Sequence, residues 1–123
     1  PNSVYVEHAV DYIAANFDKR LKINELADHI GVNRSYLTSS FKKTLGCSPQ
    51  EYLMNLRIEK AKSLLKNGDI QVSEVAARVG YRDPLAFSKV FKARTGRSPR
   101  EYKEEKRRLV VKGKKGDYTE SEA

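Results

Sequence analysis

The segment GCSPQEY at residues 46–52 is repeated fifty positions later as GRSPREY at residues 96–102. The similarity continues toward the N-terminus in two further pairs of segments, FKKTLG (41–46) with FKARTG (91–96) and ELADHIG (25–31) with EVAARVG (74–80). The last pair is offset by forty-nine, so the second copy holds one extra residue between Gly80 and Phe91. A match over about thirty residues that includes the glycines indicates a duplicated structural unit.

Each copy predicts two helices joined by a tight turn. Apolar residues recur with i, i+3, i+4, i+7 spacing over 23–30 and over 72–79, and a glycine follows each stripe where a helix would end. Asn33 is a good N-cap for the next helix, and Asp83 with Pro84 takes the same place after the longer second turn. Such pairs are typical of helix-turn-helix units, which we predict at 23–44 and 72–95.

The segments SPQE and SPRE predict capping boxes, in which a serine caps a helix that begins with proline and carries glutamate in its first turn. The first box opens a helix expected over 49–66, which at ~1.5 Å per residue is long enough to act as a rigid strut between the units. The second opens a similar helix, and a further helix is expected over residues 4–17. The fold class is therefore all-α, with two helix-turn-helix units, a long linker helix and about seven helices. We expect one domain over residues 1–107 and a flexible polar tail over 108–123.

The periodicity also predicts which apolar side chains are buried. In the first helix these are Val6, Val10, Ile13 and Phe17. In the second helices of the two units, i+4 spacing predicts burial of Leu37, Phe41 and Leu45, and then of Phe87, Val90 and Phe91. In the linker helix the apolar residues are Tyr52, Leu53, Leu56, Ala61, Leu64 and Leu65.

The charge balance favours a polyanionic partner. Lys and Arg number 24 against 16 Asp and Glu, which gives a formal net charge of +8. Nucleic acid and an anionic membrane surface both fit this excess, and solubilising charge is the plain alternative. No apolar run approaches the ~18 residues of a membrane span. Cys47 is the only cysteine, so no disulfide forms within the chain and a reducing compartment is expected.

The outward faces of the two second helices, about 34–44 and 84–94, lack acidic residues. A helix of ~10–12 Å diameter fits the DNA major groove, so these faces are candidates for contact with double-stranded DNA. The predicted base-contacting residues are Arg34, Ser35, Thr38, Ser39, Pro84, Leu85, Ser88 and Lys89. The predicted phosphate-contacting residues are Lys42, Lys43, Ser48, Arg82, Lys92, Arg94 and Arg97.

Residues 23–65 and 72–102 resemble the DNA-binding domain of the AraC/XylS family of bacterial transcription regulators, and the similarity extends over about residues 5–107. The most specific part is EVAARVGYRDPLAFSKVFKARTGRSPREY. The resemblance implies that two recognition helices enter successive major-groove segments on one face of the duplex. It also matches Arg57 to an arginine of the family's linker helix, for which pairing with Glu or Asp is the alternative to a phosphate contact.

The resemblance further implies a separate N-terminal effector or dimerisation domain. We therefore expect the chain to be the C-terminal part of a longer regulator, with a free-standing activator as the second possibility. Activation through RNA polymerase, a location in the bacterial cytoplasm on the nucleoid, and a role in carbohydrate utilisation are implied in the same way. The residues themselves do not reveal the operator, the effector or the oligomeric state.

Other classes of function fit the residues less well. His8 and His29 are isolated, no cluster has metal-ligand spacing, and no glycine-rich phosphate loop is present, so we predict no enzyme, metal or cofactor. A helical protein-interaction module remains the main rival. An RNA-binding role is weaker, because the phenylalanines fall on core stripes rather than on an exposed stacking platform.

Overall fold

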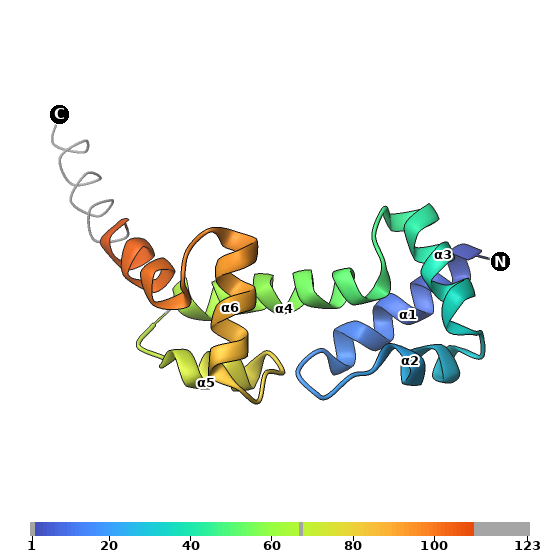
Figure 1. Cartoon of the computed structure of the whole chain (residues 1–123), viewed down its shortest axis with the longest axis horizontal. Coiled ribbons are helices and arrows are strands. Elements are labelled where there is room, and N and C mark those ends of the chain that lie inside the picture. Colours follow the sequence, from blue (N-terminus) through green and yellow to red (C-terminus); the bar gives the residue numbers. More distant parts are fainter. Residues whose placement is uncertain (1, 67, 110–123) are drawn as a thin grey trace, which may run out of the picture. The chain divides into compact units, whose positions relative to one another are not determined.

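The computed structural model describes residues 2–66 and 68–109, and every regular element within them is an α-helix. The helices in chain order are α1 (Asn2–Asn16), α2 (Ile23–Ile30), α3 (Arg34–Leu45), α4 (Pro49–Lys66), α5 (Val72–Arg78) and α6 (Pro84–Thr95) (Figure 1). Residues 99–109 are also helical. The predicted all-α fold of about seven helices is thus confirmed.

The chain divides into two compact units. The first comprises the residues up to Lys60 together with Arg78–Gly80, and the second comprises Ala61–Ala77 and the described residues from Tyr81 onward. The helix α4 therefore contributes its first two-thirds to one unit and its end to the other. The single domain expected over residues 1–107 is divided accordingly, and each unit has a buried apolar centre of its own.

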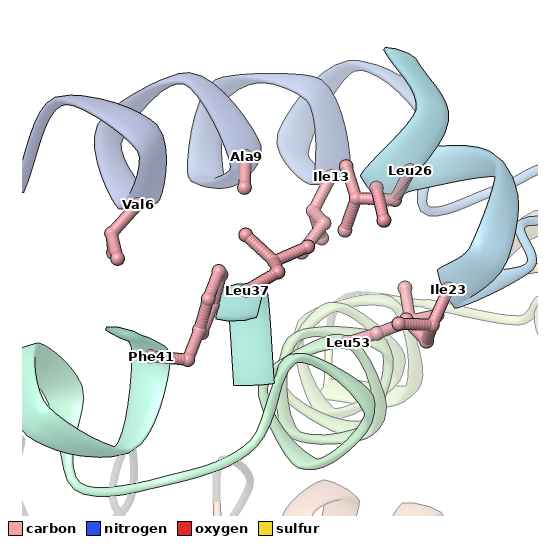
Figure 2. Close-up of a cluster of buried hydrophobic side chains, with 9 residues drawn as sticks. Val6, Ala9, Ile13, Ile23, Leu26, Leu37, Phe41 and Leu53 are labelled. Carbon is pink, nitrogen blue, oxygen red and sulfur yellow. The ribbon is translucent and has the colours of Figure 1, made fainter. Parts of the chain in front are cut away.

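The first unit buries one face of each of its helices. Figure 2 shows Val6, Ala9 and Ile13 of α1 directed toward side chains of α2 and α3. The whole buried cluster consists of Val6, Ala9, Ile13, Ile23, Leu26, Ala27, Leu37, Phe41 and Leu53. Residues spaced three or four apart supply it from α1, α2 and α3, as expected for amphipathic helices that meet at a shared core, and α4 adds Leu53.

The turn of the first unit satisfies its backbone polar groups. Gly31 has φ of 90°, which favours glycine, and its N–H donates to the carbonyl of Ala27. The N–H of Val32 donates to the same carbonyl at 3.1 Å, and the Asn33 side chain accepts from the N–H of Tyr36 at 2.7 Å. These bonds end α2 and begin α3 within three residues, so the predicted helix-turn-helix geometry is present.

The second unit repeats this arrangement with a longer turn. The N–H of Tyr81 donates to the carbonyl of Ala76 at 2.8 Å, and the Asp83 carboxylate accepts from the N–H of Leu85 at 3.0 Å. Asp83 is thus the N-cap of α6, and Pro84 follows as its first residue. The buried side chains of this unit are Ala61, Leu65, Val75, Ala76, Phe87, Phe91 and Pro99.

Both predicted capping boxes are formed. The hydroxyl oxygens of Ser48 and Ser98 accept from the N–H groups of Glu51 and Glu101, in each case at 3.1 Å. In the second box the N–H of Ser98 donates to the Glu101 carboxylate at 3.4 Å, and hydrogen bonding of this carboxylate by the Ser98 side chain and then by this N–H lowers the pKa of Glu101. The first box differs, because the Ser48 hydroxyl donates to the Glu51 carboxylate at 3.1 Å.

The structure corrects several details of the sequence analysis. Leu45 is 43% exposed rather than buried, because it is the last residue of α3 and lies beyond the part of the helix that meets the core. Val10, Phe17 and Val90 are only half-buried. The first helix begins at Asn2, and residues 108 and 109 continue the last helix instead of opening a tail. The remainder of the predicted tail lies outside the described residues.

Candidate nucleic-acid interface

In the first unit, α3 exposes the face opposite its buried Leu37 and Phe41. Of the residues predicted to contact DNA there, Arg34, Ser35, Ser39, Lys42 and Lys43 are exposed and Thr38 is half-buried. The Nη1 group of Arg34 donates to the Asn24 side chain at 3.3 Å, which links the start of α3 to α2. No Asp or Glu occurs in the helix. The face therefore offers hydroxyl groups in its centre and cations at both ends.

In the second unit, α6 presents a different face from the same scaffold. Its buried side is formed by Phe87 and Phe91, and the residues of α6 that are predicted to contact DNA lie elsewhere on the helix. Those residues are Pro84, Leu85, Lys89, Lys92 and Arg94, all exposed, and Ser88, which is half-buried. Leu85 is 71% exposed, so most of its apolar surface is available to a partner. This helix too contains no acidic residue.

The structure places Arg57, one of the predicted phosphate contacts, on the inward face of the first unit. It lies on α4 with only 9% of its surface exposed. Its Nε and Nη2 groups donate to the backbone carbonyls of Phe17 and Lys19, both at 2.9 Å. The guanidinium thus fixes the loop after α1 to α4, and its role is structural. Its i+4 spacing between buried Leu53 and Ala61 is the sequence signal that placed it on the inward face.

The other predicted phosphate contacts lie near helix ends and turns. Arg82 is exposed in the turn before α6, and Ser48 is half-buried at the start of α4. The Nε of Arg97 pairs with the Glu105 carboxylate at 2.7 Å, with the two side chains 54% and 40% exposed. Exposed ion pairs contribute only ~0–1 kcal/mol, so this pair is not a strong competitor for a phosphate group.

One cationic surface was missed in the sequence analysis. Helix 99–109 carries Arg100, Lys103 and Arg107 along one face, with Glu104 among them, and they line a cavity of about 470 Å³. The lining also includes Ser88 of α6. We call this feature the cationic hollow. The spacing of the three cations, at i, i+3 and i+7 within REYKEEKR, is the signal that could have revealed it.

The structure gives no indication of metal chemistry in the described ranges, where no three side chains of His, Cys, Asp or Glu are grouped to hold an ion. Among the same residues, no helix is both long enough and apolar enough to cross a membrane. The features that are present are two capped helix-turn-helix units whose second helices expose cationic, acid-free faces. Together these define a helix-turn-helix DNA-binding protein.

Comparison with known proteins identifies the family. A family model described as a helix-turn-helix domain matches residues 26–105. The lactose operon transcription activator of Staphylococcus xylosus is 41% identical over 98 residues, which are 80% of this chain and 35% of that protein. The raffinose operon regulatory protein of Pediococcus pentosaceus is 39% identical over 95 residues, 77% of this chain and 34% of that protein. The chain thus spans about a third of the length of the curated relatives that it matches.

Two solved structures show the same fold. The C-terminal domain of AraT, a response regulator from Geobacillus stearothermophilus, has a TM-score of 0.79 and 35% identity, over 81% of this chain and 84% of that one. The DNA-binding domain of AdpA, solved in complex with a target DNA, has a TM-score of 0.78 and 27% identity, over 83% and 92%. The chain therefore belongs to the AraC-type family of helix-turn-helix transcription regulators. Membership of this family confirms the predicted resemblance and the prediction that the chain is not an enzyme.

Proposed function

We propose that this protein binds double-stranded DNA at specific sequences by placing α3 and α6 in successive segments of the major groove. The observation that carries the proposal is the equivalence of the two helices. Each is held by an N-cap side chain, buries two aromatic or aliphatic residues against its own unit, and exposes a face with basic but no acidic residues. A protein-interaction module would not require acid-free faces at equivalent places in both units.

The side chains of α6 supply most of the expected sequence preference. Lys89 can donate to O6 or N7 of guanine, and the exposed Leu85 can pack on a thymine methyl group. Pro84 and Ser88 border them on the same face. In α3 the corresponding chemistry is limited to Arg34 and to the hydroxyl groups of Ser35, Thr38 and Ser39. Short hydroxyls accept and donate with little discrimination, so the first unit depends more on DNA shape.

The phosphate contacts position these helices without selecting a sequence. We assign them to Lys42 and Lys43 at the end of α3 and to the start of α4 at Ser48. In the second unit we assign them to Arg82, Lys92, Arg94 and Arg97. Each neutralised phosphate releases counterions, so binding should weaken steeply as the salt concentration rises.

We further propose that the DNA-binding segment serves a transcription activator of a sugar-utilisation operon. The names of the Staphylococcus xylosus and Pediococcus pentosaceus relatives support this, since they concern lactose and raffinose operons. Those relatives are about three times as long as the matched region, which leaves room for an effector or dimerisation domain. Activation would then proceed through contact with RNA polymerase. The regulator would be located in the bacterial cytoplasm, on the nucleoid.

The test is selection of bound duplexes from a random pool, followed by sequencing, at two salt concentrations. Two short motifs ~10 base pairs apart are expected, one for each recognition helix. The double variant Thr38→Ala and Lys89→Ala should lose most of this preference and keep most of its affinity for random DNA. The matched control, Thr44→Ala with Lys22→Ala, removes an exposed threonine and an exposed lysine from outside the proposed face.

Each other outcome contradicts a stated part of the proposal. Salt-dependent binding without an enriched motif would disprove major-groove recognition while leaving non-specific binding. An absence of binding at both salt concentrations would disprove the DNA-binding function altogether. In that event the protein-interaction module becomes the better interpretation.

A further inference from the structure

The cationic hollow lies directly beside the face of α6 that we assign to the bases. Ser88 belongs to that face and also forms part of the wall of the hollow. A helix inserted in the major groove is flanked on both sides by sugar–phosphate strands, because the groove is only about 12 Å wide. A concave surface at the side of α6 is therefore where one of these strands would run.

The chemistry of the hollow suits a phosphate strand. Arg100 and Arg107 are exposed, so their guanidinium groups are accessible to a ligand. Lys103 is half-buried and its Nζ donates to the backbone carbonyl of Ile70 at 2.6 Å, which holds its charge in a fixed place between the two arginines. A hydrogen bond to a neutral carbonyl does not cancel that charge. Three cations thus line about two turns of a single helix face.

We propose that the cationic hollow receives one sugar–phosphate strand of the DNA whose major groove α6 enters, with Arg100 and Arg107 contacting its phosphates. This inference rests on the proposed DNA-binding function and extends it to residues outside both helix-turn-helix units. Arginine is suited to the role, because its planar guanidinium can donate two parallel hydrogen bonds to one phosphate.

The equivalent positions of the first unit do not carry a row of cations like that of the hollow. Fifty positions before the hollow-lining residues stand Gln50, Leu53, Met54 and Arg57. Leu53 is part of the first unit's core, and Arg57 is buried with its guanidinium bonded to backbone carbonyls. Within residues 2–66 and 68–109, this row of accessible cations accompanies the recognition helix of the second unit alone, so the additional phosphate contacts belong to the second half of the DNA site.

Glu104 provides a test of the opposite sign. Its carboxylate is exposed and lines the same cavity, so it must repel a phosphate strand that lies there. Replacing it with glutamine removes this repulsion and leaves the side chain nearly the same size. If the strand occupies the hollow, Glu104→Gln should bind DNA more tightly than the unmodified protein. A purely structural role for this residue predicts no gain.

The experiment measures affinity for a duplex selected by the unmodified protein and for a random duplex, across a series of salt concentrations. The variants are Arg100→Gln, Arg107→Gln and their combination, with Arg108→Gln as the matched control, because Arg108 is exposed on the same helix and does not line the hollow. Each hollow arginine should contribute about one unit to the slope of log affinity against log salt concentration.

With a slope of ~0.9 per contact, one arginine contributes about fivefold more to the binding affinity at ~0.15 M salt than at ~1 M. Each single variant should therefore lose about fivefold in affinity at ~0.15 M salt, and the double variant about thirtyfold. Both duplexes should be affected equally, because phosphate contacts carry no sequence information. Arg108→Gln should leave both the affinity and the slope unchanged. Circular dichroism of each variant shows whether it is folded, and the Glu104→Gln gain tests the proposal without removing any cation.

The inference fails if Arg107→Gln and Arg100→Gln behave like Arg108→Gln, or if Glu104→Gln gains no affinity, while the unmodified protein still selects its motif. That result would leave the proposed function intact. If the unmodified protein binds no DNA, the proposed function itself is overturned, and the inference with it. The two failures are therefore distinguished by the unmodified protein alone.

Discussion

The two units share a scaffold and differ in what they expose. Both have a glycine-ended first helix, a side-chain N-cap, buried phenylalanines at equivalent positions and a serine–glutamate capping box. Outside these features they diverge, since the predicted base-contacting residues of α3 are mainly hydroxyl residues, while those of α6 include Leu85 and Lys89 beside the cationic hollow. The comparison shows that the residues which build the turn and the core are kept in both copies, whereas the exposed faces are specialised separately.

The largest expected effect tests whether the scaffolds are energetically equivalent. Phe41 and Phe91 are identical residues at equivalent positions, and both are fully buried. Phe41→Ala and Phe91→Ala should each lower the free energy of unfolding by about 3–5 kcal/mol, because each leaves a large cavity. Urea denaturation followed by far-ultraviolet circular dichroism measures the loss.

The conservative variants Phe41→Leu and Phe91→Leu serve as controls for this comparison, because they remove less volume and should cost less. If one alanine variant loses several kcal/mol and the other loses almost nothing, the two units are not supported by equivalent cores. The sequence repeat would then reflect shared turns without shared energetics.

The next effect separates two arginines that are fifty residues apart. Arg57 donates to two backbone carbonyls in the first unit, and charged hydrogen bonds of this kind contribute about 1.5–3 kcal/mol each. Arg57→Ala should therefore lower the free energy of unfolding by about 3 kcal/mol. Arg107→Ala, at an exposed position, should change it by less than ~0.5 kcal/mol.

Thermal and urea denaturation of the two variants provide the measurement. Arg57→Lys serves as the control, because it keeps the charge and loses the planar group that reaches both carbonyls at once. If Arg57→Ala is stable but binds DNA more weakly, the result would favour the prediction that Arg57 contacts a phosphate group.

A third prediction concerns the difference between the two recognition helices. Lys89→Ala should remove about 1–3 kcal/mol of discrimination at one position of the DNA site, as expected for a lysine that contacts guanine. Ser39→Ala in α3 should remove less than ~1 kcal/mol, because a single hydroxyl discriminates weakly. Binding to duplexes with single base-pair changes measures both. Equal losses from the two variants would contradict the assignment of most sequence preference to α6.

The smallest expected effect concerns the capping box of the second unit. Hydrogen bonds from Ser98 lower the pKa of Glu101 below its ordinary value of 4.5, chiefly through the Ser98 side chain and then its backbone. Since the folded pKa is depressed, Glu101 contributes stability above its ordinary pKa, and this contribution disappears as the pH falls through the folded value. The stability gap between the unmodified protein and Glu101→Gln should therefore close in acid.

Denaturation of both proteins at a series of pH values from neutral to below 4.5 measures this gap. Glu104→Gln is the matched control on the same helix, because Glu104 takes no part in the capping box. A gap for Glu101→Gln that stays constant into acid would show that the carboxylate charge does not stabilise the box.

The sequence was sufficient where local chemistry decides the structure. Helix starts are marked by capping bonds between residues at most three positions apart, as at Asn33, Asp83 and the two serine–proline segments. The local sequence alone was therefore enough to predict where these helices begin. The apolar stripes that predict α2 and α5 also depend only on residues at most seven positions apart. The exposed faces of α3 and α6 then followed from the placement of their buried phenylalanines.

Other features depended on segments far apart in the chain. Arg57 looks like an available cation until residues 17–19 are folded against it, and the bonds span 38 and 40 positions. The cavity beside Arg107 exists because helix 99–109 packs near Ser88, which no local pattern specifies. Leu45 fits the periodic stripe but lies at the end of its helix, where periodicity no longer guarantees a neighbour.

Gly31 and Gly80 occupy equivalent places after the first helix of each unit, and both have positive φ angles, 90° and 97°. Around Gly31 no atom lies within 4 Å of where a Cβ would stand, while at Gly80, which clusters with the first unit, that Cβ would lie 2.6 Å from the Phe17 carbonyl oxygen. Over evolutionary time Gly31 can therefore drift to asparagine, which tolerates the left-handed region. Every single-nucleotide missense change at Gly80 introduces a Cβ, so among natural variants that codon should be the more strictly retained of the two.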